Sequence, residues 1–134
     1  MILEKKHIKQ VYKSELINVI DGDTIDVKIE FGLGFFCNAR IRLKGIDAPE
    51  IKKVKKESSE YKNGTVAKYK VKKWFAENGT CIYVSAESRG LYGRWLGEIW
   101  ADVGENSLND YMIKECYKTS YKEWKHQEPL KKIN

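Results

Sequence analysis

The sequence predicts an α+β domain in which five short strands close into a Greek-key barrel and two helices pack against it. Strand and helix patterns follow one another in the order three strands, helix, two strands, helix, and five short strands need closure to protect their edges. The 134 residues, 42% of them hydrophobic, suffice for one core and are too apolar for a disordered chain. We therefore expect one domain over residues 1–134 of the OB type, an arrangement that often binds oligonucleotides, with the barrel at roughly 8–101.

The first three strands are expected between residues 16 and 46. Residues 16–20 are mostly apolar and lead into the turn-forming sequence Asp21-Gly22-Asp23. Residues 24–31 then alternate strictly between apolar and polar, which is typical of a half-buried strand. After a break at 32–34, extended structure resumes over 35–46, and we expect a loop over 31–38. Inward-facing residues are predicted to be Ile25, Val27, Ile29, Phe31, Ala39, Ile41 and Leu43.

The later helices and strands are predicted from a change in the spacing of apolar residues along the chain. Residues 51–60 are polar and lysine-rich, which favours an exposed loop. Apolar residues in 65–77 recur at helical spacing, so we expect a first helix at roughly 61–77 that Gly79 ends. Two more strands are expected at 80–86 and 93–101. The pair Ser107 and Asp110 resembles a capping box and starts a second helix at roughly 107–116, followed by a short C-terminal tail.

The charge balance indicates a polyanionic partner. The 25 Lys and Arg residues exceed the 19 Asp and Glu residues, for a net charge of +6, which favours nucleic acid or an anionic surface. Nine of the lysines lie between residues 51 and 73, against two glutamates. Lysine contacts to phosphates would give affinity that does not depend on base sequence.

Other features of the sequence bear on membrane association, on the state of the cysteines and on cellular location. No apolar run is long enough to cross a bilayer, so we expect no membrane association. Three distant cysteines without metal-type spacing predict buried thiols. No apolar leader follows Met1, which favours a cytoplasmic protein, although a secreted chain whose leader had been removed would look the same.

Four separated motifs together predict phosphodiester cleavage: 21–24 (Asp-Gly-Asp-Thr), Arg42, 47–50 (Asp-Ala-Pro-Glu) and 92–94 (Tyr-Gly-Arg). Each motif alone is common, and Asp-Gly is an ordinary hairpin turn. Carboxylate oxygens suit Ca²⁺ or Mg²⁺, and a nearby glutamate can take a proton from an attacking water. Two arginines present forked donors that match phosphate oxygens.

These motifs, in this order and near this spacing, resemble the staphylococcal nuclease (thermonuclease) family over roughly residues 16–121. The resemblance implies an OB-type barrel and Ca²⁺-dependent hydrolysis of DNA and RNA, with little sequence specificity and 3′-phosphate products. We expect a monomer with no obligate protein partner. The implied Ca²⁺ ligands are Asp23, Asp47 and the backbone carbonyl of Ala48, with Asp21 behind them.

The resemblance assigns the remaining roles as well. Glu50 would be the general base, and Arg42 and Arg94 would bind the scissile phosphate and stabilise its transition state. Tyr92 would contact the terminal phosphate of the nucleotide, and either Tyr117 or Tyr121 would stack on the base.

The chain departs from the family pattern at three places. Ala48 stands where threonine is usual, Leu91 stands where lysine is often found, and residues 31–38 form a longer connection. Two other functions fit parts of the sequence. A non-catalytic OB-type module would bind nucleic acid without cutting, but degenerate modules lose the acids or arginines that this chain keeps. An Asp-x-Asp phosphatase is excluded, because that chemistry sits on a parallel strand with a helical crossover.

Overall fold

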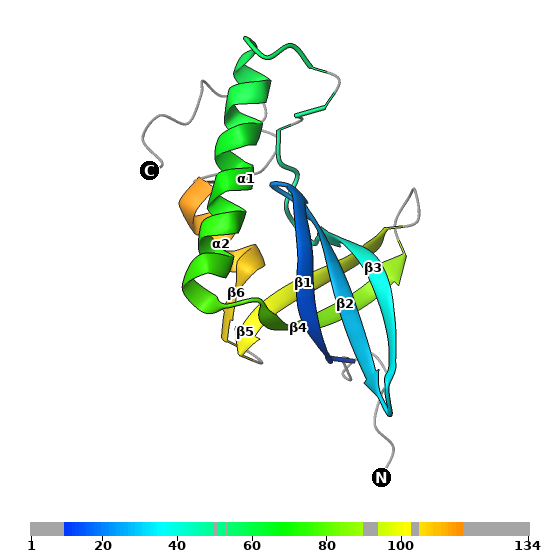
Figure 1. Cartoon of the computed structure of the whole chain (residues 1–134). Coiled ribbons are helices and arrows are strands. Elements are labelled where there is room, and N and C mark those ends of the chain that lie inside the picture. The colour runs from blue at the N-terminus through cyan, green and yellow to red at the C-terminus, as the bar shows by residue number, and fades with distance from the viewer. Residues whose placement is uncertain (1–9, 50, 53, 90–93, 103–104, 117–134) are drawn as a thin grey trace.

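The computed structural model of the chain describes residues 10–49, 51–52, 54–89, 94–102 and 105–116 (Figure 1). Its elements are β1 (Tyr12–Asp21), β2 (Thr24–Gly32), β3 (Phe35–Leu43), α1 (Ser59–Asn78), β4 (Cys81–Arg89), β5 (Trp95–Asp102), β6 (Glu105–Ser107) and α2 (Leu108–Cys116). No helix in these ranges is both long and apolar enough to cross a bilayer.

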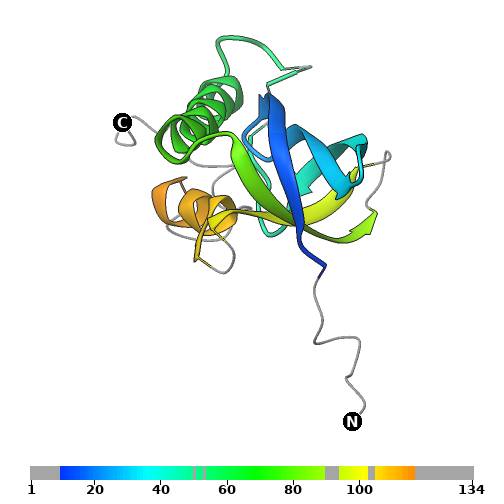
Figure 2. The same cartoon turned by 60° about the horizontal axis from the view of Figure 1, so that its bottom comes forward.

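The strands form a closed barrel. Their order in the sheet is β3-β2-β1-β4-β5-β6, and a parallel pairing of β3 with β5 closes the first five into a barrel (Figures 1 and 2). This arrangement confirms the predicted five-stranded barrel with two helices. The short strand β6 was not predicted; it pairs antiparallel with the end of β5 and leads directly into α2.

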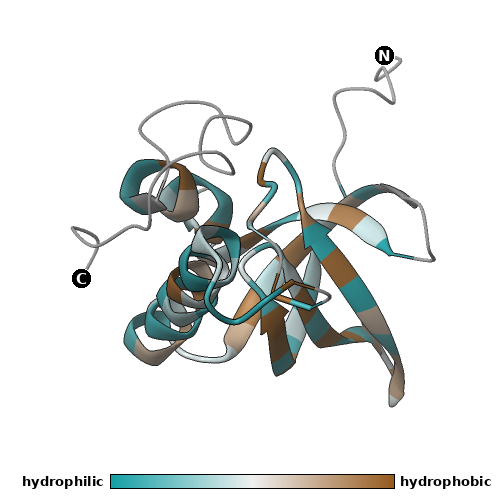
Figure 3. Ribbon diagram, turned by 90° about the horizontal axis from the view of Figure 1, so that it is seen from above, coloured by the Kyte–Doolittle hydropathy of each residue, from teal (hydrophilic) through white to brown (hydrophobic). Residues whose placement is uncertain are grey.

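The core lies inside the barrel and under the helices. Ile25 and Val27 of β2 and Ile41 and Leu43 of β3 are fully buried, as their alternation predicts. Figure 3 shows this alternation as bands of opposite hydropathy along the strands. Val71, Trp74 and other buried residues of α1 continue the core from the helix side, and Leu108 and Met112 of α2 complete it.

The predicted loop over residues 31–38 is wrong. Strands β2 and β3 continue through it as a hairpin, with Glu30 opposite Phe36 and Gly32 opposite Phe35. The tip at 32–34 turns tightly because all three of its residues have positive φ. Phe31 is 54% exposed rather than buried, since strand alternation does not show where the core ends.

The helices keep the predicted order but differ in detail. Helix α1 starts at Ser59, earlier than expected, because the Ser58 side chain accepts a hydrogen bond from the backbone N–H of Tyr61 (3.1 Å). It ends as predicted at Gly79, whose φ is +89°. Ser107 caps α2 by accepting from the N–H of Asp110 (2.9 Å). The expectation of buried thiols is wrong for Cys37 and Cys81, which are both exposed.

Candidate metal and phosphate site

The turn between β1 and β2 gathers its own polar groups. The backbone N–H of Asp23 donates to Asp21 Oδ1 (3.1 Å), and the Thr24 hydroxyl donates to Asp23 Oδ1 (2.8 Å). The other carboxylate oxygen of Asp23 accepts the N–H of Ala48 (2.9 Å), which lies 25 positions along the chain. Asp23 is only 6% exposed. The turn and the segment after β3 are therefore joined through one buried carboxylate.

Position 22 of this turn requires glycine because there is no room for a side chain. A Cβ atom at this position would lie 2.5 Å from the Cβ of Ala67 in α1 and 2.8 Å from the Cβ of Ala48. Its φ is not among the positive values of the described glycines, so backbone conformation does not demand glycine. Helix α1 therefore packs directly against the turn, and sequence reasoning missed this contact.

Arg42 brings the two acidic segments together. It lies on β3 opposite Thr24, so register places it beside the turn. Its Nη2 atom lies 2.9 Å from Asp47 Oδ1 and 3.6 Å from Asp23 Oδ2, and it donates to the carbonyl of Ile46 (3.2 Å). The Arg42 side chain is partly buried, at 28% exposure.

The electrostatics of the site are dominated by burial. Burial raises the pKa of Asp23 to about 7, and the hydrogen bond and charge of Asp21 act in the same direction. Thr24 and Arg42 oppose this rise. Burial alone would lower the pKa of Arg42, but the nearby aspartates, Asp23 first, outweigh it and raise that pKa. The side chains of three aspartates thus surround the single guanidinium of Arg42, so acidic groups outnumber basic groups at this site.

Asn109 at the start of α2 fixes the segment that follows β3. Its side-chain amide donates to the carbonyls of Lys44 (2.9 Å) and Gly97 (3.1 Å), and its oxygen accepts the N–H of Ile99 (3.1 Å). Asn109 is 4% exposed. It therefore ties the segment leading to Asp47 to β5, and sequence analysis gave no signal of this role.

Comparison with known proteins decides the family. The model of the staphylococcal nuclease homologue family matches residues 40–133, which is most of the chain. This chain belongs to that family. It is 33% identical over 129 residues to the uncharacterized protein MJ1439 of Methanocaldococcus jannaschii, covering 82% of this chain and 59% of the relative. It is also 33% identical over 100 residues to uncharacterized endonucleases of Escherichia coli and its O157:H7 strain, covering 74% of this chain and 54% of each.

This nuclease homologue thus spans little more than half the length of the curated relatives it matches. The family match begins after the turn of Asp21 and Asp23. That turn is joined to the matched region by the contacts of Asp23 with Ala48 and Arg42.

Of the remaining candidate residues, the structure describes only Arg94. Arg94 immediately precedes β5, where Trp95 pairs with Ile41 and Leu96 with Arg42, so its backbone lies beside β3. It is partly buried. Four other candidates lie outside the described residues: Glu50, Tyr92, Tyr117 and Tyr121.

The chemistry of the described donors fits a hard divalent cation. Within the described ranges no group of three or more His, Cys, Asp and Glu side chains is arranged to hold a metal. Asp23 and Asp47 nevertheless supply carboxylate oxygens, the ligands that Ca²⁺ prefers, next to the backbone of Ala48. Asp23 is buried beside a second carboxylate, and a divalent cation would favour its ionised form.

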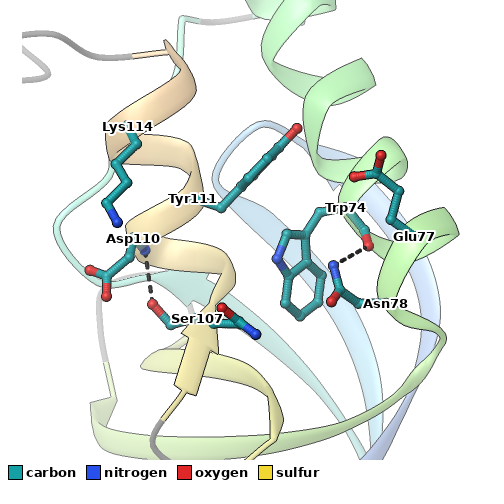
Figure 4. Close-up of a pocket in the computed structure, with 8 residues that line it drawn as sticks. Trp74, Glu77, Asn78, Ser107, Asp110, Tyr111 and Lys114 are labelled. Carbon is teal, nitrogen blue, oxygen red and sulfur yellow. Dashed lines mark hydrogen bonds between the residues drawn. The ribbon is translucent and has the colours of Figure 1, made fainter.

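The groove between the helices is a separate feature. It has a volume of about 430 Å³, and its walls include Trp74, Asn78 and Asp110 (Figure 4). Asn78 donates to the carbonyl of Trp74, and the N–H of Asp110 is used in capping α2. Trp74 lies about 10 Å along α1 from Ala67, so the groove is not part of the carboxylate site.

Proposed function

We propose that this family member is a Ca²⁺-dependent nuclease that hydrolyses phosphodiester bonds of DNA and RNA with little sequence specificity, leaving 3′-phosphate ends. The observation that supports this most strongly is the convergence of Asp23 and Asp47, from opposite ends of the β2–β3 hairpin sequence, on the guanidinium of Arg42. The names of the Escherichia coli relatives point to the same class of reaction.

The proposed ion site uses Asp23, Asp47 and the carbonyl of Ala48, with Asp21 orienting the turn behind them. Bound Ca²⁺ would polarise the phosphoryl oxygen and offset its charge. The hydrogen bonds from Thr24 and Ala48 hold the Asp23 carboxylate in a fixed orientation before any ligand arrives. Such preorganisation is what makes a charged site effective in catalysis.

Arg42 is suited to hold the phosphate. One of its nitrogens is fixed by Asp47 and the Ile46 carbonyl, while a guanidinium carries five N–H donors in all. The remaining donors can therefore bind phosphate oxygens without the side chain having to reorient. Arg94, which immediately precedes the neighbouring strand β5, would hold the side of the phosphate that carries the leaving oxygen.

In the reaction we propose, Glu50 accepts a proton from water. The water oxygen bonds to phosphorus as the bond from phosphorus to the 5′-oxygen breaks, and that oxygen takes up a proton. The 3′-phosphate remains on the other fragment. Arg42 and Arg94 stabilise the extra negative charge as the phosphorus becomes five-coordinate. The lysines of residues 51–73, apart from Lys70, which is buried, add affinity for the phosphate backbone that weakens with salt.

The test is digestion of single-stranded DNA with Ca²⁺ or with chelator. Arg42→Ala and Glu50→Gln should each slow cleavage by on the order of a hundredfold or more. Arg40→Ala is the matched control, because Arg40 lies on the same strand but is exposed and paired with Asp26 at 2.8 and 3.0 Å. Digestion by both variants at the wild-type rate would refute the assigned roles. A salt-dependent gel shift without Ca²⁺-triggered degradation would assign the binding module instead.

A further inference from the structure

Helix α1 buries one side in the fold, and its opposite side carries a tyrosine among lysines (Figure 1). Tyr69 lies near the middle of this outer side and is 58% exposed. Three lysines lie within about 60° of it around the helix axis: Lys62, Lys72 and Lys73. Lys62 and Lys72 are exposed, and Lys73 is partly buried. We call these four residues the lysine face.

Neither acidic residue of this helix, which is described from end to end, lies on the lysine face. Glu60 precedes Tyr69 by about two and a half turns, so it lies on the opposite side of the helix. Glu77 belongs to the last turn and lines the groove beside α2 (Figure 4). In the described part of the chain, none of the three lysines is held in an ion pair. Their ammonium groups are therefore available to an anion from outside the molecule.

The lysine face and the carboxylate site lie on opposite sides of the same helix. Ala67 packs against Gly22 of the acidic turn. Tyr69 follows Ala67 by two residues, which is about 200° around the axis and about 3 Å along it. A strand bound to the lysine face therefore passes level with the acidic turn, about one helix diameter, or 10 Å, away from it. A long strand can reach both surfaces at once, whereas a fragment of two nucleotides reaches only one.

We propose that the lysine face is a second binding surface for single-stranded nucleic acid, on which Tyr69 stacks against a base and the lysines bind the phosphates on either side. Aromatic side chains set in a basic path hold single strands without reading their sequence. Lys62 and Lys72 lie about 15 Å apart along the axis, about four times the 3.4 Å spacing of phosphates along a strand. That the bound strand is also a substrate rests on the proposed function, and the surface then favours long substrates over short ones.

The residues around Tyr69 favour a nucleic-acid strand over an anionic membrane. Helices that bind such membranes bury large apolar side chains next to their basic ones. The other exposed residues on the outer side of α1 include Thr65 and Ala76, which offer little apolar area. A base needs only the one flat ring that Tyr69 provides.

The salt dependence of binding tests the lysines. A labelled DNA strand of about 20 nucleotides is titrated in chelator, which prevents Ca²⁺-dependent cleavage. Lys62→Gln/Lys72→Gln should weaken binding and reduce the slope of log K against log salt by about 1.4, because each phosphate contact of a single strand contributes about 0.7. Lys13→Gln/Lys114→Gln is the charge-matched control, since it removes two exposed lysines that lie outside α1. Equal slopes for the two variants would overturn the proposal.

The role of Tyr69 is tested by comparing single strands with a duplex of the same sequence. Tyr69→Ala should weaken binding of the single strand about tenfold, and Tyr69→Phe, which keeps a ring that can stack, should bind as wild type does. Neither variant should alter binding of the duplex, whose bases are already stacked and paired. Equal losses on both forms of DNA would overturn the stacking role. Binding to phosphatidylglycerol vesicles without binding to DNA would overturn the whole proposal and assign the face to a membrane.

The lysine face and the proposed nuclease activity can fail separately. A protein that shows the expected slopes but never cleaves DNA with Ca²⁺ would refute the proposed activity and support a nucleic-acid surface on α1. A protein that cleaves DNA with Ca²⁺ but binds it equally well in both double-lysine variants would refute the lysine face and leave the proposed activity standing.

Discussion

Replacing Gly22 with alanine tests the contact between α1 and the acidic turn. The new methyl group would lie 2.5 Å from the Cβ of Ala67 and 2.8 Å from the Cβ of Ala48, where ordinary contacts begin at 3.4 Å. Neither neighbour can rotate out of the way, because a Cβ atom is fixed to its backbone. The turn or the helix must shift, and overpacking of this kind costs about 1–3 kcal/mol.

The same shift should be visible in catalysis. Asp23 follows Gly22 directly, and its carboxylate is bonded to the Ala48 N–H. A misplacement of about 1 Å in a positioned group can cost about a hundredfold in rate. Gly22→Ala should therefore lose far more activity than its loss of stability explains, at a temperature where the variant remains folded.

A double-mutant cycle isolates the contact. Ala67→Gly removes one of the two clashing atoms and by itself costs about 1 kcal/mol in the helix. Urea unfolding in chelator should show that Gly22→Ala/Ala67→Gly is more stable than the sum of the single variants predicts, by about 1 kcal/mol. Gly45→Ala is the control, because no atom lies within 4 Å of its added Cβ and its cost comes from a φ of +83°.

Additive effects within about 0.5 kcal/mol would refute the reasoning. They would mean that Ala67 does not limit the space at Gly22. A coupling of the same size between Gly45→Ala and Ala67→Gly would also refute it, because the coupling would then come from general loosening of the fold.

Three further outcomes follow from the structure. Since burial raises the pKa of Asp23 from 3.8 to about 7, ionisation of this carboxylate disfavours the folded state, and the penalty grows as the pH rises from about 4 to 7. Asp23→Asn removes this penalty but also replaces one of the two oxygens that accept hydrogen bonds, so its stability relative to wild type should improve from pH 4 to pH 8 in chelator. Urea unfolding at the two pH values measures this change, and a difference between variant and wild type that does not depend on pH would contradict the reasoning. Asn109→Ala, which removes the side-chain hydrogen bonds to the carbonyls of Lys44 and Gly97 and to the N–H of Ile99, should lose about 2 kcal/mol and lower the thermal midpoint. Ser107→Ala should lose about 1 kcal/mol by removing the cap of α2, whereas an unchanged urea midpoint would show that the cap is unimportant.

The strands and helices were predictable where one face of an element is buried along its whole length. Strict alternation identified β2, and helical spacing identified the buried stripe of α1. At the β2–β3 tip the break at 32–34 and the strand from residue 35 were predicted correctly, but the loop over 31–38 was wrong. Glycines that interrupt a pattern look the same whether they open a loop or tighten a hairpin. The prediction also failed to detect the first residues of β1, whose Tyr12 is held by pairing with Val84 of β4 rather than by its own pattern.

The candidate site was predictable as a set of motifs but not as a set of contacts. The order of the acidic and arginine motifs indicated that Asp23, Arg42 and Asp47 act together, and the structure brings these three side chains into contact. Nothing in the sequence distinguishes Ala67 from other alanines on a helical stripe. Its role depends on the distance to Gly22, which only the packing of α1 on the barrel determines.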